Sequence, residues 1–296
     1  MDLRRIGVPP LSAPPSVPTA LVDLHLHSSA SDGLLPPAAV VHRAAEVGLT
    51  AIALTDHDTV AGIPEAQAEG ERLGVRVVSG CEFSTLAPWG EAHILGYFLP
   101  AGDAALAEFL RRCREDRVRR GREMVEGLQA WGVDVSFEDL VEETAGAAMG
   151  RPHLARALVR LGKVASVEDA FDLWLARGRP AFVEKRLPSF AQVAQLVHSV
   201  GGLVSAAHLK ERGTRNVLST LKEEGLDAVE TRHPGHSGEA RARLTALADS
   251  LDLLRTGGSD WHGDLDAEST HAMIGSQEVP AEWLARLEER VGKGIS

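Results

Sequence analysis

The feature that most constrains the fold is a series of short apolar runs that each end or begin at a residue able to bind a metal. The first run, residues 21–26, contains His25 and is followed directly by His27. Side chains alternate between the two faces of a strand, so residues two apart point the same way. His25 and His27 can therefore direct two imidazoles at one point, a geometry that metal sites use. A single His-x-His pair is weak evidence, and the later runs strengthen it.

Strand-like and helix-like segments then alternate. Apolar runs at 51–54 and 75–78 lead into His57 and Glu82, and a helical segment that stops at glycine precedes each run. Parallel α/β sheets and barrels build their sites at the carboxyl ends of strands, where these residues fall. His93 begins a strand at 93–98 with no helix after Glu82. A parallel crossover needs a dozen or more residues, so an antiparallel hairpin should place His93 beside Glu82.

The strand signal vanishes between about 103 and 180, where helices are expected at 103–130, 137–143, 152–161 and 167–176. Strands resume at 203–207, 227–230 and 253–256, which makes seven in all. This pattern predicts an α/β barrel with an inserted all-helical domain. The expected organisation is a Pro-rich tail at 1–20, barrel segments at 21–100 and 186–296, and the helical insertion at 101–185.

The candidate metal ligands share one property: each is an imidazole or a carboxylate at the end of an apolar run. They are His25, His27, Asp32, His57, Glu82, His93, His208, Asp260 and His262. This mixture suits Zn, Mn or Fe better than the all-oxygen sites that Ca and Mg prefer. Nine ligands are too many for one ion, so two or three divalent ions are expected, with Glu82 as a bridge.

Composition limits the partners. The formal net charge of −11 argues against a protein coated by nucleic acid, and no stable DNA complex is expected. An anionic substrate remains compatible, because divalent metals reverse the local field. The two cysteines have no paired spacing, which favours a reduced, cytoplasmic compartment. No run is apolar enough to span a membrane, and five prolines break up the first 20 residues, unlike a signal peptide.

Seven motifs in order give the chain a resemblance to a known family. They are His25-Leu26-His27, Asp32-Gly33, Thr55-Asp56-His57-Asp58, Gly80-Cys81-Glu82-Phe83, His93-Ile94-Leu95-Gly96, Ala207-His208 and Gly258-Ser259-Asp260-Trp261-His262. From about residue 21 to 263 the chain resembles the PHP (polymerase and histidinol phosphatase) superfamily. It is most similar to the branch of nucleoside 3′,5′-bisphosphate phosphatases and RNase AM, which carries a helical insertion with a Gly-Arg-Pro-His motif, here residues 150–153.

The resemblance implies a distorted (βα)7 barrel and three metal positions. His25, His27, Glu82 and Asp260 would hold one ion; Glu82, His93 and His208 a second; Asp32, His57 and His262 a third. One departure is Leu209, where the family usually has proline; the loop after it, with Lys210 and Arg212, is expected to face the substrate.

The implied activity is metal-dependent hydrolysis of a phosphate ester. The favoured substrate is a small nucleotide with two phosphates, such as a nucleoside 3′,5′-bisphosphate, or the 5′ end of a short RNA. The alternatives are a phosphatase of another small ester, such as histidinol phosphate, and a non-catalytic PHP module. A silent module would be expected to lose ligands, and here all nine are present.

Four residues are candidates for contact with the substrate: Arg151, Lys185, Lys210 and His236. Arg151 is either a phosphate clamp or an exposed arginine, with the clamp favoured because a guanidinium binds phosphate bidentately. For Lys185, a phosphate clamp and a solvated charge are equally favoured interpretations. His236 follows the sixth strand and is a candidate for proton transfer. The arginines between 111 and 122 are expected to form a solvated helix face, with an RNA path as the minor alternative.

Overall fold

The computed structural model describes residues 20–144, 150–263 and 272–293. Eight strands form one sheet in the order β7-β6-β5-β4-β3-β2-β1-β8. They are β1 (Leu21–Leu26), β2 (Ala51–Leu54), β3 (Arg76–Ala87), β4 (Gly90–Tyr97), β5 (Leu203–Ala206), β6 (Ala228–Arg232), β7 (Leu254–Gly257) and β8 (Val279–Pro280). The segment after β7 returns to β1: His27 N donates to Trp261 O at 3.0 Å, and Asp260 N donates to His25 O at 2.9 Å. The sheet is therefore a nearly closed barrel, as predicted.

Two features of the barrel differ from a regular parallel one. β3 and β4 form the predicted antiparallel hairpin, with Glu82 opposite Leu95 and Ser84 opposite His93. β4 is also antiparallel to β5, whereas β1–β2–β3 and β5–β6–β7 are parallel. The predicted number of seven strands was too low. β8 pairs antiparallel with β1 over two residues, one of them Pro280, which is too short for a periodic signal.

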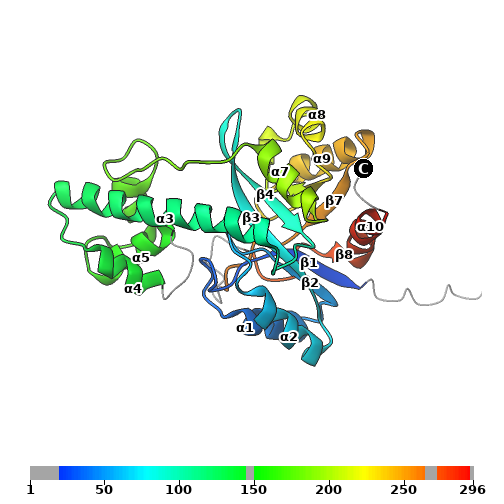
Figure 1. The fold of residues 1–296 in the computed structure, drawn as a ribbon, viewed down its shortest axis with the longest axis horizontal. Coiled ribbons are helices and arrows are strands. Elements are labelled where there is room, and N and C mark those ends of the chain that lie inside the picture. The colour runs from blue at the N-terminus through cyan, green and yellow to red at the C-terminus, as the bar shows by residue number, and fades with distance from the viewer. Residues whose placement is uncertain (1–19, 145–149, 264–271, 294–296) are drawn as a thin grey trace, which may run out of the picture.

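Six α-helices of the described residues belong to the barrel part of the chain: α1 (Pro37–Glu46), α2 (Ile63–Leu73), α7 (Phe190–Ser199), α8 (Arg215–Glu223), α9 (Gly238–Ser250) and α10 (Ala281–Gly292). A short 3₁₀-helix, η2 (Lys210–Arg212), follows β5. Figure 1 shows α1 and α2 on one side of the sheet, α7 to α9 on the opposite side, and α10 near β8. Ser189 and Gln192 form a capping box at the start of α7. The apolar faces of these helices pack against the strands in three buried clusters. These clusters form the hydrophobic core of the barrel beneath its loops.

The chain between β4 and α7 is helical, as expected, and extends away from the barrel (Figure 1). Its elements are α3 (Ala104–Ala130), α4 (Phe137–Thr144), α5 (Arg151–Arg160), α6 (Val167–Ala170) and the π-helix η1 (Phe171–Leu175). The helix predicted at 167–176 is thus a short α-helix that continues as a π-helix. The C-terminal half of α3 packs with α4 to η1, and Leu106 and Leu110 of its N-terminal half lie in the barrel core. Whether 101–185 folds as a domain of its own stays a prediction, and the predicted tail lies outside the described residues up to Thr19.

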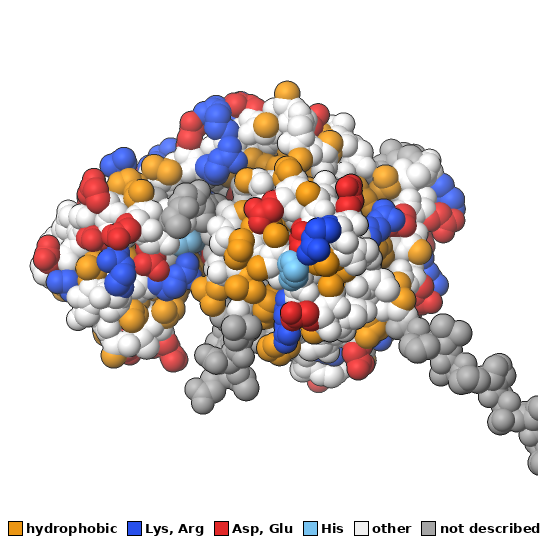
Figure 2. Space-filling model, turned by 90° about the horizontal axis from the view of Figure 1, so that it is seen from below, with side chains coloured by type: hydrophobic (Ala, Val, Ile, Leu, Met, Phe, Trp, Pro, Cys, Tyr) orange, Lys and Arg blue, Asp and Glu red, His pale blue; other side chains and the backbone are white. Residues whose placement is uncertain are grey.

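The arginine-rich face of α3 is only partly solvated. Arg111, Arg112 and Arg119 are exposed or half-buried and pair with acidic residues one turn away, as predicted. Arg117 and Arg120 are buried instead, so the prediction was wrong for them. On the face in Figure 2, acidic and basic side chains of the described residues are interspersed and form no continuous basic stripe.

Candidate metal centre

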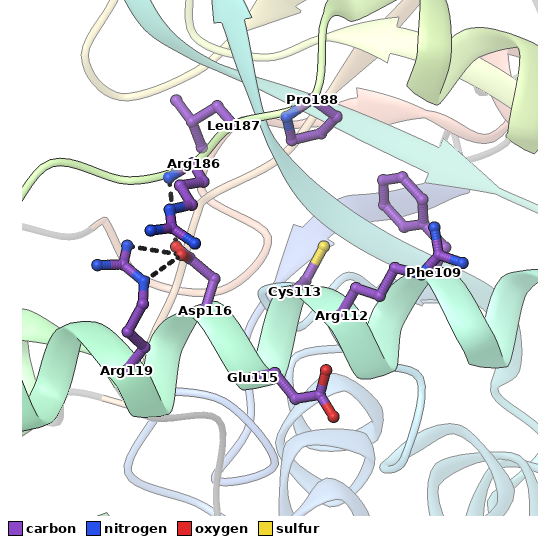
Figure 3. A pocket seen from close by; sticks show the side chains of 9 residues that line it. All are labelled: Phe109, Arg112, Cys113, Glu115, Asp116, Arg119, Arg186, Leu187 and Pro188. Carbon is purple, nitrogen blue, oxygen red and sulfur yellow. Dashed lines mark hydrogen bonds and ion pairs between the residues drawn. The ribbon is translucent and has the colours of Figure 1, made fainter.

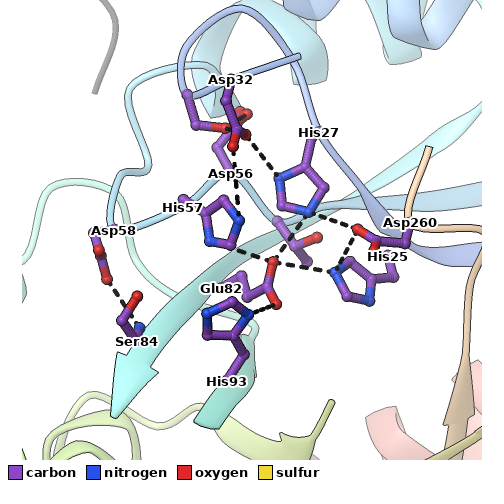
Figure 4. Close-up of polar contacts among 12 residues, drawn as sticks. His25, His27, Asp32, Asp56, His57, Asp58, Glu82, Ser84, His93 and Asp260 are labelled. Carbon is purple, nitrogen blue, oxygen red and sulfur yellow. Dashed lines mark hydrogen bonds and ion pairs between the residues drawn. The ribbon is translucent and has the colours of Figure 1, made fainter. Parts of the chain in front are cut away.

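Strand geometry brings the predicted ligands to the carboxyl end of the barrel. His25 lies in β1 and His27 just after it, and both side chains are fully buried on the same side. His57 follows β2, and Glu82 lies in β3 beyond the point where it pairs with β2. His93 lies in β4, and His208 and Asp260 follow β5 and β7. Figure 4 shows that residues from separate strands and loops converge on one centre.

Glu82 is the midpoint of this centre. Its carboxylate is 1% exposed and lies among five imidazoles. Oε2 is 3.2 Å from His25 Nε2, 3.1 Å from His27 Nε2 and 3.4 Å from His57 Nδ1, whereas Oε1 is 2.8 Å from His93 Nδ1 and 3.0 Å from His208 Nε2. The two oxygens thus face different sets of nitrogens, which is the arrangement that a bridging carboxylate requires.

Four groups of ligand atoms in the described residues lie close enough to share an ion, with all atoms of a group within 4.8 Å of one another. The groups are His25, His27, Glu82 and Asp260; His57, Glu82 and His93; His27, Asp32, His57 and His262; and His25, Glu230 and His233. The first three groups resemble the three predicted sets. His57 is added to the second set, and His27 is added to the third. His208 joins the second group through its 3.0 Å contact with Glu82. That these residues bind metal stays a prediction.

The hydrogen-bonding state of the histidines fits a metal. Both ring nitrogens of His27 and Nδ1 of His57 are buried and have no hydrogen-bond partner, although carboxylates lie nearby. A buried polar atom without a partner is costly, and native proteins rarely leave one unsatisfied. The neutral imidazole nitrogen is a common metal ligand, so an ion at these points would satisfy the orphaned nitrogens.

The electrostatics point the same way. Burial opposes the ionisation of Glu82, but His57, His93 and His25 together hold its pKa well below the usual range. Burial also lowers the pKa of His27, yet the carboxylates of Asp260 and Glu82 outweigh it and raise that pKa to about 10. Burial dominates at His57 and lowers its pKa to about 3. A centre that stabilises carboxylate anions and draws positive charge to His27 is one that divalent cations complete.

Local backbone geometry is unusual at the ligands. His208 and Asp260 have φ of 30° and 53°, values that non-glycine residues rarely adopt. Gly258 allows the loop to approach β1, since a Cβ there would lie 2.4 Å from Cβ of His25. Strained backbone of this kind persists where surrounding contacts enforce it, and it clusters at functional sites.

Two further residues lie at this centre, and neither is among the nine predicted ligands. Glu230, fully buried in β6, lies 3.0 Å from His25 Nδ1 through Oε1, and its Oε2 accepts a hydrogen bond from His208 N at 2.7 Å. His233 Nε2 lies 3.3 Å from Asp260 Oδ2. Glu230 fixes the ring of one predicted ligand and the backbone of another. Its position at the carboxyl end of the sixth strand was the available signal.

Two of the predicted substrate residues lie beside the centre. A pocket of about 290 Å³, called here the site pocket, is bordered by His93, His208, Arg151 and Lys210. Arg151 is the first residue of α5, with Gly150 as its N-cap. The helical segment therefore overhangs the ligand end of the barrel at this point.

Lys185 and His236 are more constrained. Lys185 forms an ion pair with Glu91 and lies 3.2 Å from Ser84 Oγ, so its charge is largely matched. His236 is buried; its Nε2 accepts from Lys210 N at 3.3 Å, and its Nδ1 lies 3.4 Å from Thr231 O. Burial lowers the pKa of His236 to about 4.

A larger pocket lies away from the ligands. It measures about 500 Å³ and opens between α3 and residues 186–188. Figure 3 shows Asp116 among the side chains that line it, hydrogen-bonded to both Arg119 and the backbone N–H of Arg186. None of the nine predicted ligands lines it, so its size does not make it the site.

Comparison with known proteins decides the family. The model of the PHP domain matches residues 23–256, most of the barrel and the helical segment. The chain belongs to the PHP family. The superfamily that the seven motifs suggested is thereby confirmed.

Curated relatives of this PHP protein match about four fifths of its length. The 5′-3′ exoribonuclease Rnm of Salmonella typhimurium is 34% identical over 82% of this chain and 85% of its own. The 3′,5′-nucleoside bisphosphate phosphatase of Chromobacterium violaceum is 32% identical over 82% and 87%. The phosphoribosyl 1,2-cyclic phosphate 1,2-diphosphodiesterase of Eggerthella lenta is 33% identical over 81% and 94%. These relatives confirm the predicted enzyme class, a hydrolase of phosphate esters.

Solved structures agree. A protein of Bifidobacterium adolescentis described as a metal-dependent phosphoesterase superposes with a TM-score of 0.83 at 30% identity, covering 94% of this chain and 98% of its own. An amidohydrolase from Chromobacterium violaceum with bound sulfate gives 0.79 at 28%, covering 92% and 97%. Dependence on divalent metal is supported by the first neighbour and the ligand groups. Among the described residues, no helix has the length and apolar character to cross a membrane.

Proposed function

We propose that this PHP protein hydrolyses phosphate monoesters of small nucleotides that carry a second phosphate, such as nucleoside 3′,5′-bisphosphates, or acts on the 5′ end of short RNA. The observation that carries the proposal is the site pocket, which joins predicted ligands (His93, His208) to cations (Arg151, Lys210). A substrate with one phosphate at the centre can reach the cations with another. The exoribonuclease and bisphosphate phosphatase relatives support this class.

Two to three Mn, Zn or Fe ions would be held by the nine predicted ligands, with Glu82 shared. When bound, such ions neutralise charge on a phosphoryl group and lower the pKa of water. The chain's own residues orient these ligands: Glu230 holds the His25 ring, and Asp56 holds the loop after β1 by accepting hydrogen bonds from Ser28 and Ser31.

The predicted substrate residues have distinct roles in this proposal. Arg151 binds the phosphate that does not react, Lys210 contacts the substrate within the site pocket, and Lys185 acts through Glu91, which it holds at the edge of that pocket. His236 is the proposed proton donor to the leaving alkoxide; this role requires His236 to take up a proton from solvent on Nε2 when the anionic substrate binds, and that Nε2 to exchange the Lys210 backbone for the substrate. A cytoplasmic location is part of the same proposal.

The test is a phosphate- and nucleotide-release screen with manganese-loaded protein. The substrates are adenosine 3′,5′-bisphosphate, a 5′-phosphorylated oligoribonucleotide, histidinol phosphate and p-nitrophenyl phosphate. We expect the first two to have the highest kcat/KM. A preference for histidinol phosphate, or release from none of them, contradicts the proposal.

Two variants complete the screen. His93→Ala is expected to lower metal content and activity while circular dichroism stays that of a folded barrel. The matched control is His42→Ala, since His42 is an exposed histidine of α1 outside the ligand groups. His236→Gln should slow release from the nucleotide far more than from p-nitrophenyl phosphate, whose leaving group needs no proton.

A further inference from the structure

A second pocket adjoins the site pocket and is lined by cations. It measures about 420 Å³, and its charged residues are Arg120, Arg151, Arg177, Lys185, Glu91 and Glu184. We call it the arginine pocket. Arg151 and Glu91 border both pockets, so the two are continuous at the start of α5.

Both carboxylates of the arginine pocket are already paired. Glu91 forms an ion pair with Lys185, and Glu184 lies 3.0 Å from Arg177. Arg120 and Arg151 form no ion pair with any carboxylate of the described residues. The pocket therefore has two guanidinium groups that no carboxylate of the described residues pairs with directly.

Arg120 is the more informative of the two, because it is 2% exposed. Its Nε donates to Val183 O at 3.3 Å, and Arg120 is one of the residues that line the pocket. Burial, together with the charges of Arg117 and Arg151, lowers the pKa of Arg120 to about 10. A buried cation beside other cations is unfavourable unless an anion joins it.

We propose that Arg120 and Arg151 form an anion subsite in the arginine pocket that holds the non-reacting phosphate of the substrate. A planar guanidinium fork matches a phosphate group bidentately, and two forks can surround its oxygens. Phe182 lies 5.8 Å from the Arg151 guanidinium and closes one wall of the pocket. This inference rests on the proposed function for the identity of the substrate, and it adds Arg120, which no sequence motif indicated.

The test compares Arg120→Met with Arg112→Met in the metal-loaded protein. Arg112 is an exposed arginine of the same helix, at the edge of the separate pocket in Figure 3. The binding probe is an analogue of adenosine 3′,5′-bisphosphate in which methylene groups replace the ester oxygens, so it cannot be hydrolysed. The kinetic substrates are the bisphosphate itself and p-nitrophenyl phosphate, which has one phosphate.

We expect Arg120→Met to weaken analogue binding and to raise KM for the bisphosphate by about ten- to a hundredfold. Turnover of p-nitrophenyl phosphate should stay within about twofold, and the melting temperature should not fall, because the variant removes an unpaired buried charge. Arg120→Lys keeps the charge but lacks the planar guanidinium fork, so its KM for the bisphosphate should lie between those of the wild type and Arg120→Met. Arg112→Met should match the wild type.

The outcomes separate this inference from the proposed function. Equal losses on both substrates, unchanged analogue binding in Arg120→Met, or no analogue binding by the wild type overturns the anion subsite. Analogue binding that depends on Arg120, without phosphate release from the bisphosphate, supports the subsite and refutes the proposed function. Phosphate release from the bisphosphate that is unaffected by Arg120→Met supports the proposed function and refutes the anion subsite.

Discussion

The ligand end of the barrel and the arginine pocket have opposite charge. At the ligand end, the buried carboxylate of Glu82 and the half-buried one of Asp260 lie among imidazoles, and those of His27 and His57 have nitrogens without hydrogen-bond partners, so this region needs cations. In the arginine pocket, Arg120 and Arg151 lack carboxylates, so that region needs an anion. From this difference we infer that metal ions bind the phosphate that reacts and that arginines bind the phosphate that does not.

The same contrast exists within one turn of α3. Arg117 and Arg120 are both buried, but Arg117 donates through Nε to Asp58 Oδ2 at 2.9 Å, whereas Arg120 has a backbone carbonyl. Asp58 follows His57 directly and also accepts from Ser84 N at 3.2 Å. Arg117 thus connects the helical segment to the loop that carries His57, whereas Arg120 lines the arginine pocket.

The largest effect is expected at the ligand end. Glu82→Gln keeps the shape of the side chain but removes the charge shared by five imidazoles. We expect kcat/KM to fall by roughly a thousandfold on every substrate, as when a key electrostatic group is lost. Elemental analysis should find two to three ions per chain in the reconstituted wild type and fewer in the variant.

The control for that variant is Glu71→Gln, an exposed glutamate of α2 outside the ligand groups. It should match the wild type in both measurements. Fewer than two ions in the wild type, or full activity in Glu82→Gln, would contradict a metal centre at the barrel end.

A stability measurement sharpens the contrast within α3. Arg117→Met leaves Asp58 buried without its cation and should lower the free energy of unfolding by about 3–5 kcal/mol. Arg120→Met removes an unpaired cation and should cause no loss. Urea unfolding of both variants checks this, and equal destabilisation would mean that Arg120 has a structural anion partner.

A smaller effect is expected beside the ligands. Glu230→Gln weakens the contact that orients the His25 ring, and such partners typically change metal affinity by about 10- to 100-fold. Activity should then recover at higher manganese concentration. Glu239→Gln, on the exposed start of α9, is the control. An unchanged manganese dependence in Glu230→Gln would show that Glu230 serves only the fold.

The sequence predicted the ligand end well because strand geometry fixes side-chain direction. His25 and His27 two apart, and a hairpin too short for a crossover between Glu82 and His93, left few arrangements open. Glu230 also lies at the carboxyl end of a strand, but it was not among the predicted site residues. β8 has two residues and carries no pattern.

The arginine pocket was harder to predict, because a helix pattern does not say what its faces meet. Arg117 lies seven residues from both Leu110 and Met124, on the buried side of α3, so its burial had a periodic signal. The pairing of Arg117 with Asp58, and the lack of one for Arg120, depend on how α3 crosses the barrel. Contacts between segments far apart in sequence decide that crossing.

The most direct test is the ratio of kcat/KM on adenosine 3′,5′-bisphosphate to that on p-nitrophenyl phosphate, measured in Arg151→Ala and Glu82→Gln at saturating metal. Hydrogen bonds to charged groups contribute about 1.5–3 kcal/mol, so Arg151→Ala should lower the ratio by roughly ten- to a hundredfold. Glu82→Gln should lower both rates and leave the ratio unchanged. An unchanged ratio in Arg151→Ala would contradict the division between metals and arginines.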